Sequence, residues 1–203
     1  MLDEAAIELN YHNHESAFDW QQVFGDAAPV EIEIGFGKCG FLISMAADQP
    51  DKRFVGIETS RKYYRKGIRK IQRADLTNVK LLLGEALHLL GRYIPENSLA
   101  GLHINFPDPW PKKRHAKRRL LSPEFVEVAA QRLLPAANFA LATDMEAYMI
   151  DALIALRGNA QLEEIFATNS RECEMPRRYS SEYEREFFSA GKTLYYATFR
   201  KKP

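Results

Sequence analysis

The sequence predicts an α/β fold, in which a mostly parallel sheet of seven strands carries helices on both faces. Two observations support this class. From residue 30 onward short apolar runs alternate with helical patterns, and four of the first five runs have a carboxylate at their carboxyl end. The chain has 203 residues, 46% hydrophobic and 27% charged, as in ordinary globular proteins. This length fits one domain at 30–203 after an N-terminal extension at 1–29.

The strands are predicted where apolar residues alternate with polar ones or run together between turn residues. The first, Val30 to Ile34, alternates with glutamates and ends at Gly35. In chain order the predicted strands are 30–34, 53–57, 79–83, 99–106, 138–143, 161–166 and 194–199.

Helices are expected between these strands. Ser60 is a suitable N-cap for a basic helix, and Pro123 after Ser122 takes the first helical position that proline favours. The expected helices are 41–47, the basic stretch from Ser60, a short helix through Leu90, 122–134 and 145–156. In such folds ligands bind outside the carboxyl ends of the strands, so these ends hold the candidate site residues.

Cysteine usage and hydropathy restrict the cellular setting. Cys39 and Cys173 are too few for a disulfide framework, so reduced thiols are expected. No apolar run approaches the roughly 20 residues that span a bilayer, and the acidic first 26 residues are unlike a signal peptide. His12 and His14 lack a convincing third metal ligand, so no metal is expected. We therefore expect a cytoplasmic protein without a membrane partner.

Positive charge is concentrated in two segments, although the net charge is only +1. Segment 61–73 contains seven Lys or Arg and segment 112–119 contains six, with no acid in either. The rest of the chain has 15 basic and 27 acidic side chains. Such patches on an acidic body favour binding to a phosphate backbone, and a solvated helix face is the alternative.

Gly35, Gly37 and Gly40 form a G-x-G-x-x-G pattern between a strand and a helix, where glycines let the backbone turn tightly beside a ligand. Glu58 ends the second strand, where an acid holds ribose hydroxyls. Nicotinamide dehydrogenases and S-adenosylmethionine methyltransferases share this layout. Glu33 favours the methyltransferase, because its charge suits a sulfonium and would repel a pyrophosphate. A glutamate pointing to solvent is the alternative.

The segment from Asn105 to Pro111 places Asp108 between two prolines at the end of the fourth strand. Proline restricts the backbone on both sides, so Asp108 and the neighbouring Trp110 are expected to be held in a fixed geometry. A tryptophan ring can stack on a nucleobase while a carboxylate accepts from its N–H groups. The segment therefore predicts a site for an aromatic base, with a stiff loop around a core tryptophan as the alternative.

These motifs resemble those of the bacterial tRNA (guanine-N7)-methyltransferases over roughly residues 30–200. The resemblance rests on the stretches Glu33 to Gly37, Gly56 to Glu58, Phe106 to Leu120, and Thr143-Asp144. It implies a Rossmann-like class I methyltransferase. The implied reaction moves a methyl group from S-adenosylmethionine to N7 of a guanine in the tRNA variable loop, conventionally position 46.

The resemblance also implies roles for single residues, with Asp108 at the catalytic position. Cofactor binding falls on Glu33, Gly35, Gly37, Glu58, Glu85 and Asp108. Substrate or RNA contact falls on Lys112, Arg114, His115, Lys117, Arg118, Arg119, Asp144, Ser181 and Glu184. The family usually has Asp in place of Glu85 and Lys in place of Glu182.

Guanine N7 carries a lone pair and no proton, so Asp108 is expected to orient the base and stabilise its developing charge rather than remove a proton. Two other functions remain open: a methyltransferase acting on another RNA base, and an RNA-binding module of the same fold without turnover. Both a monomer and a homodimer are compatible with the sequence.

Overall fold

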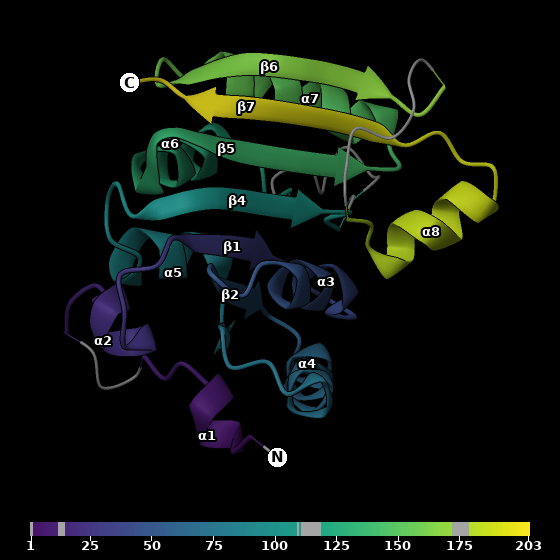
Figure 1. Cartoon of the computed structure of the whole chain (residues 1–203). Helices are drawn as coiled ribbons and strands as arrows, with labels where there is room; N and C mark the ends of the chain where they lie inside the picture. The colour runs from purple at the N-terminus through teal and green to yellow at the C-terminus, as the bar shows by residue number, and fades with distance from the viewer. Residues whose placement is uncertain (1, 12–14, 109, 111–118, 172–178) are drawn as a thin grey trace.

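The structure is a computed structural model that describes residues 2–11, 15–108, 110, 119–171 and 179–203 (Figure 1). Its described part contains a seven-stranded sheet in the order β3-β2-β1-β4-β5-β7-β6. All neighbours pair in parallel except β7, which runs antiparallel to β5 and β6. The strands are β1 (Val30–Ile34), β2 (Arg53–Glu58), β3 (Val79–Leu83), β4 (Leu99–Asn105), β5 (Leu133–Thr143), β6 (Leu162–Asn169) and β7 (Tyr195–Lys201).

Helices cover both faces of this sheet, as predicted. One core contains α5 (Ala86–Tyr93), α6 (Pro123–Arg132) and α7 (Glu146–Arg157), represented by Leu89, Phe125 and Tyr148. The other core contains the short α1 (Glu4–Ile7), α3 (Gly40–Asp48) and α4 (Arg61–Ala74), represented by Ile7, Leu42 and Ile68. The remaining helices are α2 (Trp20–Phe24) and α8 (Glu182–Ser189). None of the described helices has the length and hydrophobicity that a membrane span requires.

Several predicted boundaries differ from the structure by a few residues, and two of them meet near residue 133. The helix expected to reach residue 134 ends at Arg132, and β5 begins at Leu133, five residues before the predicted strand. Pro135 explains the difference, because proline disfavours the helical conformation of the residue before it. The predicted caps are confirmed: the Ser60 hydroxyl accepts from the backbone N–H of Tyr63, and the Ser122 hydroxyl from that of Phe125.

The N-terminal residues pack against the sheet. Ile7 and Phe18 are buried, and the backbone N–H of Leu9 donates to the carbonyl of Leu81 in β3 at 2.9 Å. The sequence pattern did not reveal this packing. The division into an extension and one domain stays a prediction.

The chain order places a topological switch between β1 and β4. From β1 the chain moves outward through β2 to β3 and then returns to β4 on the other side of β1. The connections after β1 and β4 therefore diverge, and a crevice opens at their carboxyl ends. In Figure 1 the arrowheads of β1, β4 and β5 point toward this edge, with α3 and α8 nearby.

Candidate active site

A cavity of about 650 Å³ lies at the carboxyl ends of the parallel strands, in the size range of small-molecule sites. Each of the first five strands contributes to its lining, as the sequence predicted. The contributions are Gly35 and Gly37 after β1, Glu58 at the end of β2, Glu85 after β3, Asp108 and Trp110 after β4, and Asp144 after β5.

The turn after β1 requires glycine at two positions. Gly35 has φ +70° and Gly37 has φ +48°, a region that other residues rarely adopt. A Cβ atom on Gly37 would also lie 3.3 Å from Cε2 of Tyr183. The turn therefore keeps its backbone open toward the cavity, as a cofactor-binding turn requires.

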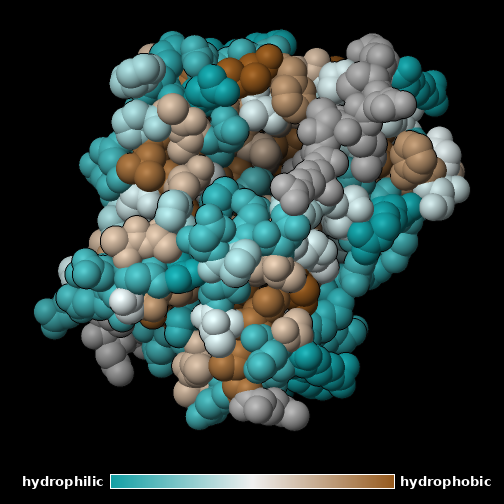
Figure 2. Space-filling model, viewed as in Figure 1, coloured by the Kyte–Doolittle hydropathy of each residue, from teal (hydrophilic) through white to brown (hydrophobic). Residues whose placement is uncertain are grey.

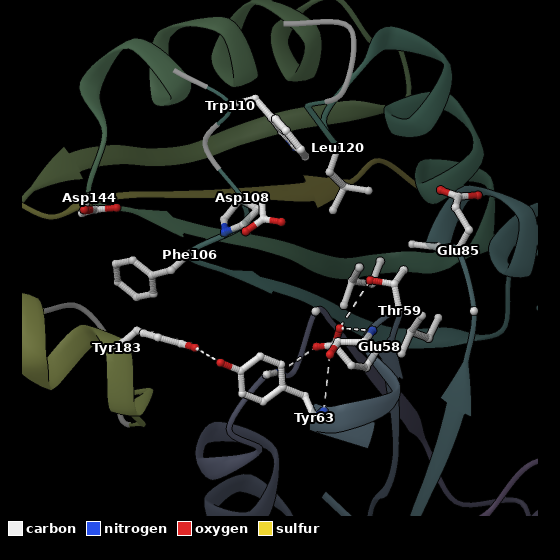
Figure 3. A pocket seen from close by; sticks show the side chains of 18 of the residues that line it. Glu58, Thr59, Tyr63, Glu85, Phe106, Asp108, Trp110, Leu120, Asp144 and Tyr183 are labelled. Atoms are coloured by element: carbon white, nitrogen blue, oxygen red, sulfur yellow. Dashed lines mark hydrogen bonds between the residues drawn. The ribbon is translucent and has the colours of Figure 1, made fainter. Parts of the chain in front are cut away.

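Glu58 ties this turn to the end of β2. Its Oε2 accepts from the backbone N–H of Gly37 at 2.9 Å, and its Oε1 accepts from that of Ser60 at 2.8 Å (Figure 3). The side chain is mostly buried but lines the cavity. Glu58 thus holds the glycine turn and presents negative charge to the space beside it.

Glu33 does not lie where a direct cofactor contact was expected. It is 2% exposed, is not among the cavity-lining residues, and its Oε1 accepts from Nδ2 of Asn105 at 2.9 Å. The alternative, a glutamate pointing to solvent, is wrong as well. Burial, and after it the charge of Glu33, raise the pKa of the Cys39 thiol, so Cys39 is a neutral packing residue.

Asp108 is exposed at the cavity, beyond the end of β4. Figure 3 shows its carboxylate between the rings of Trp110 and Phe106. Phe106 has φ +51° and Trp110 has φ +41°, which non-glycine residues adopt at a cost of order 1–3 kcal/mol. The positive φ angles thus constrain the backbone beside Asp108, as the sequence predicted for Asp108 and Trp110, and the ring of Phe106 is an addition to that prediction.

Comparison with known proteins identifies the family. A family model described as "Putative methyltransferase" matches residues 27–197. A tRNA (guanine-N(7)-)-methyltransferase of Geobacter metallireducens is 35% identical, over 95% of this chain and 92% of that protein. The chain belongs to the tRNA (guanine-N7)-methyltransferase family. A second member, from Chromobacterium violaceum, is 37% identical over 99% of this chain and 88% of its own length.

A solved structure confirms the predicted fold class. The 16S rRNA methyltransferase KamB superposes with a TM-score of 0.67 at 17% identity, covering 93% of this chain and 96% of that one. The chain therefore has the Rossmann-like class I methyltransferase fold.

Glu85, where the tRNA (guanine-N7)-methyltransferase family usually has Asp, has a local structural role. Its two carboxylate oxygens accept from the backbone N–H groups of Leu87 and His88 at 3.0 and 2.7 Å, which caps α5. The residue also lines the cavity, on the opposite side from Tyr183 in Figure 3. A negative group at a helix N-terminus is favourable, so capping keeps the longer side chain in place.

Ser181 and Glu184, for which the family resemblance implies substrate or RNA contact, are not brought to the cavity. Their side chains and backbones form a capping box at the start of α8. Glu184 is 0% exposed, and its Oε1 accepts from the Tyr196 hydroxyl at 2.9 Å. These contacts anchor α8 to β7 and correct the interpretation of both residues as direct RNA contacts in this geometry.

The basic segment after Asp108 lies largely outside the described residues, and with it Lys112, Arg114, His115, Lys117 and Arg118. Arg119 is described. Its guanidinium pairs with Asp151 of α7 and lies 5.6 Å from the ring of Tyr148. Its side chain is 12% exposed, and RNA contact by Arg119 stays a prediction.

The cavity-lining residues that were not predicted include Tyr63, Tyr183, Phe187 and Lys192. Lys192 pairs with Asp144 at 2.6 Å and lies 3.9 Å from the centre of the Phe187 ring. Burial raises the pKa of Tyr183, so its hydroxyl keeps its proton at neutral pH. The sequence could have indicated Tyr183, because it lies between Ser181 and Glu184, two residues for which the family resemblance implies a role.

The lining chemistry fits S-adenosylmethionine. The carboxylates Glu58, Glu85, Asp108 and Asp144 suit a ligand with a sulfonium, an ammonium and ribose hydroxyls, and Gly35 and Gly37 allow close backbone approach. Among the described residues no group of three potential ligands could hold a metal ion. His12 and His14 lie outside the described residues.

Proposed function

We propose that this chain transfers a methyl group from S-adenosylmethionine to N7 of a guanine in tRNA, at position 46 of the variable loop. The observation that carries the proposal is the position of Asp108 and Trp110, on a constrained loop facing a cavity with the glycine turn and Glu58. Membership of the tRNA (guanine-N7)-methyltransferase family supports the same substrate. A tRNA substrate also favours a cytoplasmic location.

The bound cofactor supplies an electrophilic methyl group on a sulfonium. The protein contributes by positioning the purine and by placing the negative charge of Asp108 beside it. The rings of Phe106 and Trp110 flank the Asp108 carboxylate, so a purine stacked there would have a fixed negative charge beside it. N7 gains a positive charge when it is alkylated, and the carboxylate stabilises that charge without reorganisation. No proton has to leave N7, so Asp108 needs no role as a base.

The RNA backbone is proposed to lie along α4. A groove on this helix is lined by Arg61, Lys62, Arg65, Lys66 and Arg69, all exposed. In the described part of the chain none of these five forms an ion pair, whereas Lys38, Lys52 and Lys70 all do. Figure 2 shows hydrophilic residues over the lower right of the molecule, where α4 lies in Figure 1.

The position of α4 connects this groove with the site. Ser60 and Tyr63, at the start of the helix, line the cavity. A helix rises about 1.5 Å per residue, so the cations from Arg61 to Arg69 extend over roughly 12 Å, starting at the mouth of the cavity. That distance suits two or three successive phosphates. Unpaired cations beside an active site are better explained by phosphate binding than by solubility alone.

The test is incubation with methyl-labelled S-adenosylmethionine and unmodified tRNA, followed by nucleoside analysis. We expect label in 7-methylguanosine and its loss when guanine 46 of a tRNA transcript is replaced by adenine. Label in another nucleoside would favour a methyltransferase of a different base. tRNA binding without any label would favour an RNA-binding module.

A further inference from the structure

α8 forms one side of the cavity although it lies far along the chain from the other lining elements. Tyr183 and Phe187, one helical turn apart, both face the cavity. The Tyr183 hydroxyl donates to the hydroxyl of Tyr63 on the first turn of α4, at 3.3 Å (Figure 3). This pair joins α8 to α4 beside the glycine turn.

Two ion pairs and a cap fix the position of Tyr183. Glu182 pairs with Lys70 of α4 at 2.8 Å, and Glu186 pairs with Lys38 of the glycine turn at 2.5 Å. The buried Glu184 anchors the first turn of α8 to Tyr196. The Tyr183 ring is therefore held from three directions, and its hydroxyl has a defined place at the cavity.

One of the two hydroxyls in the pair can still donate a hydrogen bond to a third group. Each phenol carries one O–H, and the single bond between Tyr63 and Tyr183 uses one of the two hydrogens. Both residues line the cavity. The remaining O–H is thus available to an acceptor inside it.

The charge of the cavity indicates which acceptor needs that donor. Four carboxylates line the cavity, and its Lys192 is paired with Asp144. The amino-acid portion of S-adenosylmethionine ends in a carboxylate, which these acids would repel. The tyrosine pair presents one neutral O–H donor beside Gly37, across the cavity from Glu85 (Figure 3). The pair offers a carboxylate a neutral hydrogen-bond donor there, although the charges of Glu186 and Glu58 also act on Tyr183.

We propose that the hydroxyl pair of Tyr63 and Tyr183 binds the carboxylate of the cofactor's amino-acid portion. This inference rests on the proposed function, because it takes S-adenosylmethionine as the cofactor. It gives α8 a direct role in cofactor binding, with Glu182 and Glu186 as positioning residues.

Two ligands separate a carboxylate contact from a general effect on the cavity. S-adenosylhomocysteine contains the carboxylate, and 5′-methylthioadenosine retains adenosine and sulfur but lacks it. Calorimetry on the full chain should show that Tyr63→Phe weakens S-adenosylhomocysteine binding about tenfold or more, the value of a hydrogen bond to a charged group. Tyr183→Phe removes the group that donates to Tyr63 and should also weaken this binding. Binding of 5′-methylthioadenosine should change less than twofold. Tyr195→Phe, outside the cavity lining, is the matched control and should change neither.

Unchanged S-adenosylhomocysteine affinity in both variants would overturn the inference. An equal loss for both ligands would also overturn it, because it would reveal a packing role or a damaged fold. Failure of the wild-type chain to bind S-adenosylhomocysteine would instead contradict the proposed function.

Discussion

Asp108 differs from the other carboxylates of the cavity in its contacts. Glu58 accepts from two backbone N–H groups, Glu85 caps α5, and Asp144 pairs with Lys192. In the described part of the chain no such partner is found for Asp108, which is exposed on a constrained loop. Its charge is therefore available to a substrate, whereas the other three also support the structure.

We expect Asp108→Asn to lower the methylation rate constant at least a hundredfold, because it removes the charge opposite the developing cation while keeping the shape. Asp108→Ala should do the same. The affinity for tRNA should stay within threefold, measured by filter binding. Activity of either variant within threefold of wild type would remove Asp108 from this role.

The sequence predicted the acids at the strand ends because the α/β pattern determines which residues follow each strand. The sequence could not predict whether each carboxylate is exposed to the cavity or buried, or which hydrogen-bond partners it has. Glu33 is in the expected strand, yet its side chain is buried and accepts a hydrogen bond from Asn105 of the neighbouring strand. Tyr63 and Tyr183 were missed because their meeting depends on how α8 folds back over α4, which no local pattern encodes.

At the level of elements, α4 has two functional faces. Tyr64, Ile68 and Ile71 are buried against the sheet, while the arginines face solvent, as the periodicity predicted. Lys70, in the basic segment 61–73, differs from these arginines, since its ammonium pairs with Glu182 and donates to the Lys38 carbonyl. The set that we propose to face RNA is therefore Arg61, Lys62, Arg65, Lys66 and Arg69.

Arg65→Ala combined with Arg69→Ala should weaken tRNA binding about tenfold and reduce the slope of log affinity against log salt by about 1.5, because two phosphate contacts are lost. Turnover at saturating tRNA should stay within twofold. Filter binding over a salt series and single-turnover methylation provide these values. Arg157→Ala with Lys202→Ala removes equal charge elsewhere. If it has the same effect, or if the α4 variant has none, the helix is only a solvated face.

α8 depends on ion pairs that suit its local sequence. Glu182 reverses the charge usual in the family, and Lys70 compensates for it at 2.8 Å. Since Tyr183 stands next to Glu182, this pair should influence the cavity more than the stability of the whole molecule. Exposed ion pairs contribute about 0.2–1 kcal/mol.

A double-mutant cycle of Lys70→Ala and Glu182→Ala should show coupling of about 0.5–1 kcal/mol in the binding of S-adenosylhomocysteine, measured by calorimetry. Glu164→Ala, which breaks the surface pair with Arg157, should leave this affinity unchanged. Additive effects of the two α4–α8 substitutions would show that the ion pair does not position Tyr183.

At the scale of the whole molecule, the buried carboxylate of Glu31 links β1 to β4 through His103. Oε2 of Glu31 lies 2.8 Å from Nε2 of His103, and Oε1 lies 2.6 Å from Nζ of Lys52. Burial alone would raise the pKa of Glu31, but the hydrogen bonds and charges of His103 and Lys52 outweigh it. They lower the pKa from 4.5 to about 2.

A carboxyl group with a lowered pKa stabilises the fold above its unfolded-state pKa and loses that contribution as the pH falls. The shift from 4.5 to about 2 corresponds to roughly 3 kcal/mol. Glu31→Gln should therefore lower the free energy of unfolding at pH 7, and the difference from wild type should shrink between pH 4.5 and pH 2. Urea unfolding at several pH values measures it, with the exposed Glu163→Gln as control. A difference that does not change with pH would contradict this role.

The overall architecture was predictable because alternating strands and helices of this length form only one common layer arrangement. All seven predicted strands are present in the described structure. The position of β7 between β5 and β6 and its antiparallel direction were not predicted. They depend on pairing between distant segments, as the register of Phe139 with Phe199 illustrates. α8 was missed for a different reason: the helix spans only about two turns, which is too short for a clear helical pattern.

The atom that accepts the methyl group is the central claim, and a single substitution in the RNA tests it. Two tRNA transcripts are compared under single turnover, one with guanine at position 46 and one with 7-deazaguanine, which has C–H in place of N7. The account predicts methylation of the first transcript and none of the second, although both bind with similar affinity. Methyl transfer to the 7-deazaguanine transcript at a comparable rate would contradict it, since another atom or position would then be the acceptor.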